Sequence, residues 1–389
     1  MTVFDSVQRN YFGRSLHQEN QYDYLNRSAR PSSTNVRAII EQWFSHYPAT
    51  AQPELAQRFR TNFLSAFFEL ALHELMILHG FQPVPHPTIS GTKRQPDFLV
   101  TGPNLRFYLE ATLATDLSAK QRAEESIKAG IYDQINKIDS PNFFLYITAL
   151  NLPHGVQPAT KKVTAFLDKQ LKTVDADTLT SQFRTGGFDS LPIWIYKDAG
   201  IRIEFRPIPK SPVMRGKKEV RPIGFYPIES QISTTAKAIK DAVCDKATRY
   251  GKLGAPYLVA INSLSSWGTD TTDIEEALFG SEQVHLDRRT GQIVGYSRKQ
   301  NGAFYGPKGP QNTRVSGAII GTILPYSIAK TSLTLYHHPH AEYPFDIQRL
   351  QIDQAFVQNM RVVLQRKPPL REHYKLDEHW PQTELKNGA

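Results

Sequence analysis

Residues 95–112 contain two short apolar runs separated by a turn at Pro103 and Asn104, and this arrangement is typical of a β-hairpin. If the loop is centred on these two residues, the strands pair outward in a register that places Asp97 directly opposite Glu110. Opposed residues of an antiparallel pair point to the same face, with Cβ atoms roughly 4.5–5.5 Å apart. The hairpin therefore predicts two carboxylates side by side on one face of a sheet.

Two carboxylates at this separation repel one another unless a cation lies between them. Mg²⁺ prefers one or two carboxylates together with water and phosphate oxygens, so Asp97 and Glu110 fit a magnesium site. Thr112 shares the face of Glu110 because side chains alternate along a strand, whereas Ala111 points to the opposite face.

Helices are expected on both sides of the hairpin. Residues 55–79 are rich in Leu, Phe, Ala, Met and Glu, and the pattern ends at Gly80, which predicts one buried helix. Glu69 lies in the middle of it and needs a charged partner, because burying an isolated carboxylate is costly. Glu74 competes with Glu69 for this role, and the spacing to Gly80 favours Glu69.

A second helix is expected over residues 118–139, followed by an apolar strand over 143–150. This helix contains Lys128, Gln134 and Lys137. The resulting order of elements is helix, strand pair, helix, strand, and each candidate residue falls where it could face one common cleft.

At these residues the chain resembles the PD-(D/E)XK nuclease superfamily. Pro96-Asp97 matches the first half of its motif, and Glu110-Ala111-Thr112 stands where the family has (D/E)-X-K. Glu69 stands where many members have a helical Glu, and Gln134 where some have a polar residue on the following helix. The spacings are similar to those of archaeal Holliday-junction resolvases, and the resemblance covers about residues 55–150.

The resemblance implies a restriction-endonuclease-like core, a mixed sheet flanked by helices, and hydrolysis of DNA phosphodiester bonds with Mg²⁺ or Mn²⁺. It implies that Asp97 and Glu110 ligate the metal, that Glu69 ligates a second ion or orients a water, and that the carbonyl of Ala111 completes the shell. Gln134 would orient phosphate or water. Such folds recur in restriction, repair and anti-phage defence, and a ribonuclease would share the same chemistry.

The chain departs from the family pattern at Thr112, which replaces the motif lysine. A lysine from the next helix, Lys128 or Lys137, could supply the missing ammonium and stabilise charge on the phosphate. Alternatively, the metal alone activates water, or the domain binds nucleic acid without cutting it. In the simplest alternative Asp97 caps a turn and Glu110 is a solvated strand residue, since such short patterns also arise by chance.

Composition limits the class of protein. The net charge of +9 and the pI near 9.4 suit a polyanionic partner such as nucleic acid, without requiring one. Cys244 is the sole cysteine, so a disulfide framework within the chain is excluded and a cytoplasmic location is expected. The first residues do not resemble a secretory signal, and no apolar run is long enough to predict a membrane span.

Two basic, Pro- or Gly-rich segments are candidates for nucleic-acid contacts, although solvated mobile loops would have the same composition. A zinc site at His337, His338 and His340 is disfavoured because no second ligand pair is suitably spaced. Gly-rich phosphate-binding loops are absent from the sequence. The candidate nucleic-acid-binding residues are Lys210, Arg215, Lys217 and Lys218 in the first segment and Arg298, Lys299, Lys308 and Arg314 in the second.

These features predict an α/β protein with an N-terminal arm and short helix over 1–50, a nuclease-like core over 51–155 and an α/β extension over 156–389, in which the extension could continue the core sheet. The arm is expected to pack through Phe12, Tyr22 and Tyr24, and a final amphipathic helix is expected over 352–364. The alternative to a metal-dependent deoxyribonuclease is a catalytically silent nucleic-acid-binding or assembly subunit. Oligomeric state and protein partners are not readable from the sequence.

Overall fold

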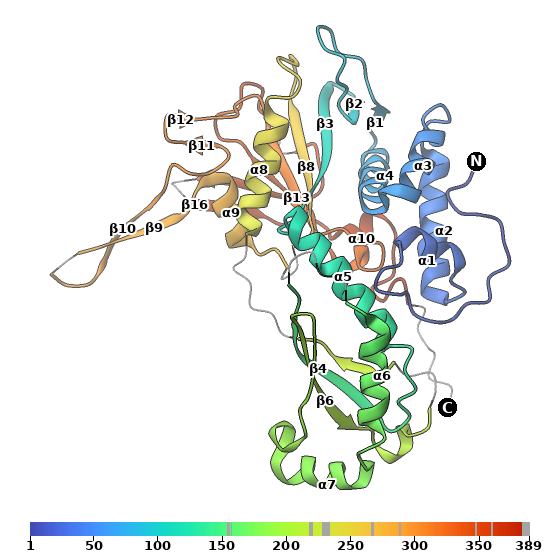
Figure 1. Ribbon diagram of the computed structural model, residues 1–389. Helices are drawn as coiled ribbons and strands as arrows, with labels where there is room; N and C mark the ends of the chain where they lie inside the picture. Colours follow the sequence, from blue (N-terminus) through green and yellow to red (C-terminus); the bar gives the residue numbers. More distant parts are fainter. Residues whose placement is uncertain are drawn as a thin grey trace. The chain divides into compact units, whose positions relative to one another are not determined.

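The computed structural model describes residues 1–153, 156, 158–217, 221–227, 234–265, 268–287, 289–346, 348–358 and 361–382 (Figure 1). The chain divides into two compact units, and both combine helices with a sheet. The first unit contains Met1–Arg14, Asn20–Asp116 and Ser233–Ala389, and the second contains Ser15–Glu19 and Leu117–Ile232. The second unit is therefore inserted between two parts of the first.

The first unit is built on an eight-stranded mixed sheet with the strand order β1-β2-β3-β8-β13-β14-β15-β16. The first three strands form an antiparallel meander, and β8 lies parallel to β3 although the whole second unit separates them in sequence. The strands are β1 (Gln82–Pro85), β2 (Phe98–Gly102), β3 (Leu105–Ala114), β8 (Tyr257–Ser263), β13 (Gly317–Gly321), β14 (Thr334–His337), β15 (Asp353–Gln358) and β16 (Arg361–Gln365).

The β2–β3 hairpin has the predicted register, with Gly102 opposite Leu105 and Phe98 opposite Leu109. Asn104 has a positive φ of 58°, a conformation that Asn adopts more readily than most residues and that a tight hairpin loop requires. Asp97 directly precedes β2, so the same register brings it to the level of Glu110.

Apolar side chains alternate between the two faces of this sheet. Leu258 and Ala260 of β8 belong to the core under helix α4, whereas Val259 and Ile261 belong to the core under α8 and α9. Figure 1 shows α8 and α9 beside β8 and β13, and α2, α3 and α4 grouped together. The helices are α1 (Gln21–Arg27), α2 (Pro31–His46), α3 (Gln52–Thr61), α4 (Phe63–Leu78), α8 (Thr235–Ala247), α9 (Thr271–Phe279) and α10 (Leu370–His373).

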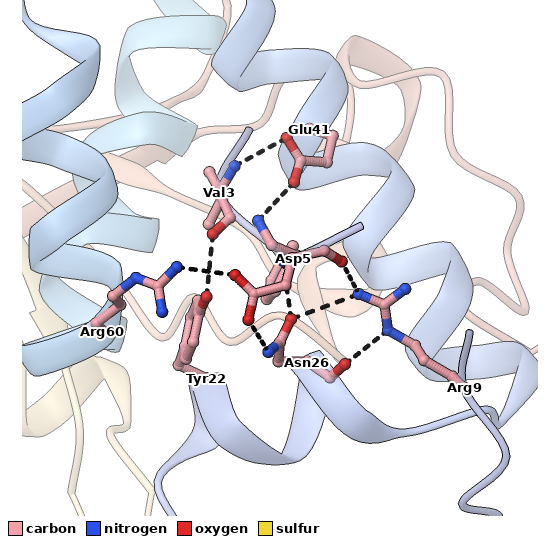
Figure 2. Close-up of polar contacts among 8 residues, drawn as sticks. Val3, Asp5, Arg9, Tyr22, Asn26, Glu41 and Arg60 are labelled. Atoms are coloured by element: carbon pink, nitrogen blue, oxygen red, sulfur yellow. Dashed lines mark hydrogen bonds and ion pairs between the residues drawn. The ribbon is translucent and has the colours of Figure 1, made fainter. Parts of the chain in front are cut away.

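The N-terminal arm is held in place by polar contacts and by part of the predicted aromatic set. The carboxylate of Glu41 on α2 accepts the backbone N–H groups of Val3 and Phe4 at 3.1 and 2.8 Å, and Arg60 pairs with Asp5 at 3.0 Å (Figure 2). Tyr22 and Tyr24 are buried as predicted. Phe12 was expected to be buried with them, but it is 68% exposed.

Two further expectations about the first unit are wrong. The single helix predicted over 55–79 is two helices, α3 and α4, because Asn62 between them leaves the helical region with φ −137° and ψ 57°. The helix predicted over 352–364 is the β15–β16 hairpin. Its Val-rich alternation suits a strand at least as well as a helix, and pairing with β14 decides between the two.

The remaining elements of the first unit are short. A two-stranded ribbon of β9 and β10 contains the exposed side chains of Val284, Val294 and Tyr296. The sheet elements are β9 (Glu282–Leu286), β10 (Ile293–Arg298), β11 (Tyr305–Gly306) and β12 (Gly309–Pro310), and a 3₁₀ turn spans Ile328–Lys330.

The second unit has its own four-stranded sheet, with the order β5-β6-β4-β7. Its core is formed where Ile131 and Ile135 of α5 meet Leu145 and Ile147 of β4. The elements are α5 (Ala119–Ile135), β4 (Phe143–Asn151), α6 (Thr160–Leu171), α7 (Ala176–Gly186), β5 (Trp194–Asp198), β6 (Ile201–Pro209) and β7 (Ile223–Phe225), with 3₁₀ turns at Gly187–Ser190 and Pro212–Met214.

This division differs from the boundaries predicted at residues 50 and 155. The helix over 118–139 and the strand over 143–150 form at the expected places, but they belong to the inserted unit and not to the sheet that contains Glu110. The expected continuation of the core sheet into the C-terminal part is observed for β8 and β13–β16. The domain boundary was predicted wrongly because the chain leaves the first sheet after β3 and returns to it only at β8.

Candidate functional site

Glu110 is the centre of a cluster of charged and phenolic side chains on the α8 side of the sheet. Its carboxylate is buried, with 3% of the side chain exposed, although it lies on a strand in the interior of the sheet. The ammonium of Lys246 lies 2.6 Å from Oε1, and the hydroxyl of Tyr250 donates to Oε2 at 2.6 Å. Arg249 approaches Oε1 to 4.0 Å. A buried carboxylate is tolerated here because each oxygen has a strong donor.

Lys246 and Tyr250 reach Glu110 because α8 crosses the sheet face to which Glu110 points. Ile239 and Val243 of α8 pack in the core with Val259 of β8 and Tyr108 of β3, and this packing fixes the helix over the site. Lys246 lies in the last turn of α8, where the helix dipole favours a cation.

Asp97 lies against Glu110 at the start of β2. Its backbone N–H is 3.3 Å from Oε2 of Glu110, and its Oδ2 accepts the N–H of Ala111 at 2.6 Å. Burial, followed by the nearby charges of Glu110 and Glu69, raises the pKa of the Asp97 carboxyl well above its usual range. The Asp97 carboxyl therefore keeps its proton to a higher pH than an exposed aspartate does.

Glu69 contributes to the same electrostatic environment from α4. Its side chain is 2% exposed, and its two oxygens accept from the hydroxyl of Tyr47 at 2.9 Å and from the guanidinium of Arg58 on α3. Burial lowers the pKa of Arg58, but the charge and hydrogen bond of Glu69, followed by the charge of Asp97, raise it above its usual value. Glu69 therefore holds Arg58 close to the carboxylate pair.

The competing residue Glu74 has a different environment. Its carboxylate accepts from, or pairs with, Nδ1 of His46 at 2.8 Å, and its charge raises the pKa of Tyr374, after burial. Among the two helical glutamates, only Glu69 is close enough to influence the pKa of Asp97 to a resolved extent. Glu69, and not Glu74, therefore belongs to the electrostatic environment of Asp97.

The predicted partners on the next helix belong to the other unit. Lys128, Gln134 and Lys137 are on α5 or just after it, in the inserted unit, while the carboxylates are in the first unit. Lys128 pairs with Glu125 at 2.9 Å, and Lys137 donates to Gln134 at 3.4 Å. The helix that covers Glu110 within its own unit is α8.

Sequence reasoning missed Lys246, Tyr250, Tyr47 and Arg58. A signal for Lys246 was present, because a lysine-rich helix precedes the apolar strand at 257–263. A helix that joins two parallel neighbouring strands crosses the face of the sheet beside them, so this helix could have been expected next to the strand of Glu110. The inserted residues 117–232 separate β3 from this helix in sequence, so the connection was not recognised. Tyr47 and Arg58 carry no comparable signal in sequence, since their contacts depend on the packing of α2, α3 and α4.

The carboxylates of the site can be compared with the ligands that a divalent cation requires. Across the described residues, no group of three or more His, Cys, Asp and Glu side chains is arranged to hold a metal ion. Oδ1 of Asp97 has no hydrogen-bond partner in the described part of the chain, and the raised pKa of this carboxyl indicates that an added cation would be favourable. Asp97 and Glu110 thus fit an ion that takes its other ligands from water and phosphate. Glu110 and Glu69 each have both oxygens engaged by protein donors, so either would ligate the ion through a remaining lone pair, whereas Asp97 has an oxygen that is free among the described residues.

The predicted nucleic-acid-binding residues of the two basic segments differ in whether they are buried, paired or exposed. Lys210 was expected to contact nucleic acid, but it is 1% exposed and donates to the carbonyl of Ser140 at 2.8 Å. Arg215 pairs with Asp177 at 2.8 Å and Arg298 with Glu275 at 2.5 Å, so both are committed to contacts within the protein. Exposed positions are found for Lys217, Lys299, Lys308 and Arg314, and Lys218 lies outside the described residues.

Comparisons with other proteins do not assign the chain to a family. No family model, curated protein or solved structure matches it. In the described residues, none of the helices has the length and apolar character needed to cross a membrane.

Proposed function

We propose that Asp97, Glu110 and Lys246 form a site for divalent-cation-dependent hydrolysis of phosphodiester bonds, with DNA as the substrate. The observation that supports this most directly is the 2.6 Å contact between the Lys246 ammonium and Glu110. It brings a lysine to the carboxylate pair from α8, whereas Thr112 occupies the position of the motif lysine in β3.

The order of elements supports the same proposal once the inserted unit is set aside. Helix α4, the β2–β3 hairpin, α8 and β8 follow one another as helix, strand pair, helix and strand, and β3 and β8 are adjacent and parallel. This is the order that the likeness to PD-(D/E)XK nucleases leads one to expect. In this interpretation α8, and not α5, is the second helix of the core, and residues 117–232 are an insertion before it.

Each residue then has a definite role. Asp97 and Glu110 would hold the cation, which supplies a more acidic bound water and neutralises charge on the phosphate. Lys246 would donate a hydrogen bond to a phosphate oxygen, since an ammonium has three donors and only one is required for Glu110. Tyr250 fixes the rotamer of Glu110, and Glu69 directs Arg58 towards the pair.

The test is cleavage of plasmid DNA, single-stranded DNA and RNA by the purified protein with Mg²⁺, Mn²⁺ or EDTA. The proposal requires cleavage that EDTA abolishes and that Lys246→Gln reduces by about 100-fold or more. Lys237→Gln is the matched control, because Lys237 is on the exposed side of the same helix and pairs with Asp241. Cleavage of RNA alone would reassign the protein as a ribonuclease.

A second candidate function is a catalytically silent nucleic-acid-binding subunit on the same fold. One observation favours it: both oxygens of Glu110 and both of Glu69 already accept from protein donors. In that case the protein would bind nucleic acid with a strong salt dependence and would cut none of the substrates with either metal.

A further inference from the structure

The inserted unit contains a basic cavity that the proposed hydrolytic site does not use. The cavity has a volume of about 360 Å³ and lies between the turn that follows α5 and the segment before β7. Among the described residues, its charged lining consists of Lys137, Lys217 and Arg221, opposed by the carboxylate of Asp139. The volume lies within the range of small-molecule sites, roughly 300–1,000 Å³.

We propose that this cavity binds a phosphate monoester carried on a sugar, either a free nucleotide-like molecule or the 5′-phosphorylated end of a nucleic-acid strand. The proposal goes beyond the function proposed above and shares no residue with Asp97, Glu110 and Lys246.

The charge of the cavity matches such a group. Three cationic side chains against one carboxylate leave a net of two positive charges. A phosphate monoester has a charge of about −1.5 to −2 at pH 7, whereas a diester has one negative charge. The end of α5 adds a partial negative charge of about 0.5, which reduces this net charge without reversing it.

Asp139 reduces the positive charge of the cavity less than an isolated carboxylate would, because it also interacts with the buried ammonium of Lys210. The Lys210 ammonium donates to the carbonyl of Ser140 at 2.8 Å, and Asp139 raises its pKa, although burial lowers that pKa by more. Part of the negative charge of Asp139 is therefore offset by Lys210. Lys210 does not line the cavity, so it acts there through its charge in place of the direct contact expected from the sequence.

A donor is also left without a partner in the wall. Oδ1 of Asn136 accepts the N–H of Ile223 at 3.3 Å, which fixes the orientation of the amide. Its Nδ2 is buried and has no hydrogen-bond partner within the part of the chain that the structure describes. A buried donor without an acceptor is costly, about 1–3 kcal/mol. Because Nδ2 is enclosed, a phosphate oxygen would reach it only after the wall of the cavity shifts on binding.

Arg221 is held in a position to bind an anion. One of its amino groups donates to the carbonyl of Ser15, and the guanidinium has further N–H groups in a fixed planar arrangement. The rest of the lining includes Ile138, Pro141 and Pro222, an apolar surface against which a sugar ring can pack. The cavity therefore offers both cationic groups for a phosphate and apolar groups for a sugar.

The experiment is calorimetric titration of the full-length protein in EDTA, which keeps the proposed metal-dependent site silent. The probes are a nucleoside 5′-monophosphate, the same nucleoside without phosphate, and inorganic phosphate. Two oligonucleotides of one sequence, with a 5′-phosphate and with a 5′-hydroxyl, distinguish the two sources. We expect the monophosphate to bind and the nucleoside not to bind. A preference for the phosphorylated oligonucleotide identifies a strand end, and binding of the mononucleotide alone identifies a free ligand.

Two variants separate binding from folding. Lys137→Gln/Lys217→Gln removes two exposed cations and should weaken monophosphate binding about 10- to 100-fold. Asn136→Asp keeps the acceptor for Ile223 but converts the unpartnered donor into a negative oxygen, and it should abolish binding. The matched control is Lys169→Gln/Lys172→Gln, which removes two exposed charges at the end of α6. Equal binding of nucleoside and monophosphate, or unchanged binding by both cavity variants, would overturn the proposal.

Discussion

Lys246 and Glu110 are 136 positions apart in the chain, and their side chains meet at 2.6 Å. The contact exists because β3 and β8 are parallel neighbours and α8, which leads into β8, crosses the face to which Glu110 points. Both side chains are largely buried, at 14% and 3% exposed. The pair therefore has consequences for stability as well as for the proposed chemistry.

Replacing Lys246 by Met should destabilise the first unit by about 3 kcal/mol, because it leaves the Glu110 charge buried with fewer donors. The double variant Lys246→Met/Glu110→Gln should recover a large part of this loss, since a neutral amide needs no cation. Urea denaturation in EDTA measures both. Strictly additive losses in the double variant would show that the two side chains are not coupled.

The position of the lysine can be tested by moving it. In the proposed mechanism Lys246→Gln lowers cleavage about 100-fold. Thr112→Lys restores a cation on the same sheet face as Glu110 and should recover part of the activity in the Lys246→Gln background, with little gain in the native background. A strong increase on adding Thr112→Lys to the native protein would instead indicate that Lys246 does not serve as the active lysine.

Asp97 predicts an unusual pH dependence of stability. Because its folded pKa is raised above the ordinary value of 3.8, the folded protein retains a proton that the unfolded chain releases. The stability associated with this proton is full below the ordinary value and is lost as pH rises towards the folded pKa. Asp97→Asn keeps an acceptor for the Ala111 N–H and removes the charge. In EDTA its melting temperature should increasingly exceed that of the native protein as pH rises, and a constant difference would contradict the assignment.

The same carboxyl links metal binding to pH. Binding of Mg²⁺ requires the ionised form, so the Mg²⁺-induced rise in melting temperature should be larger at pH 8.5 than at pH 6. Asp97→Ala and Glu110→Ala should each remove this rise and abolish cleavage. A pH-independent rise that both variants retain would place the ion elsewhere.

The local part of the site could be predicted and the long-range part could not. The hairpin register depends on the turn at Asn104 and on alternation, both of which are readable in sequence, so the proximity of Asp97 and Glu110 is confirmed. Lys246 could not be placed, because the 117–232 insertion made α5 the next helix in sequence but not in the first unit. The buried position of Lys210 was equally hidden, since a basic, Pro-rich composition does not distinguish a loop from a strand end packed against Ser140.

Glu69 allows a last distinction between binding the ion and positioning a cation. Its oxygens accept from Tyr47 and Arg58, so we expect it to act through Arg58. Glu69→Gln and Arg58→Lys should then both lower cleavage while the Mg²⁺ concentration for half-maximal stabilisation stays unchanged. Tyr47→Phe, which removes one hydrogen bond to Glu69, should cost only about 1 kcal/mol of stability and little activity. If Glu69 is instead a metal ligand, Glu69→Gln alone shifts the Mg²⁺ midpoint several-fold, and Arg58→Lys does not.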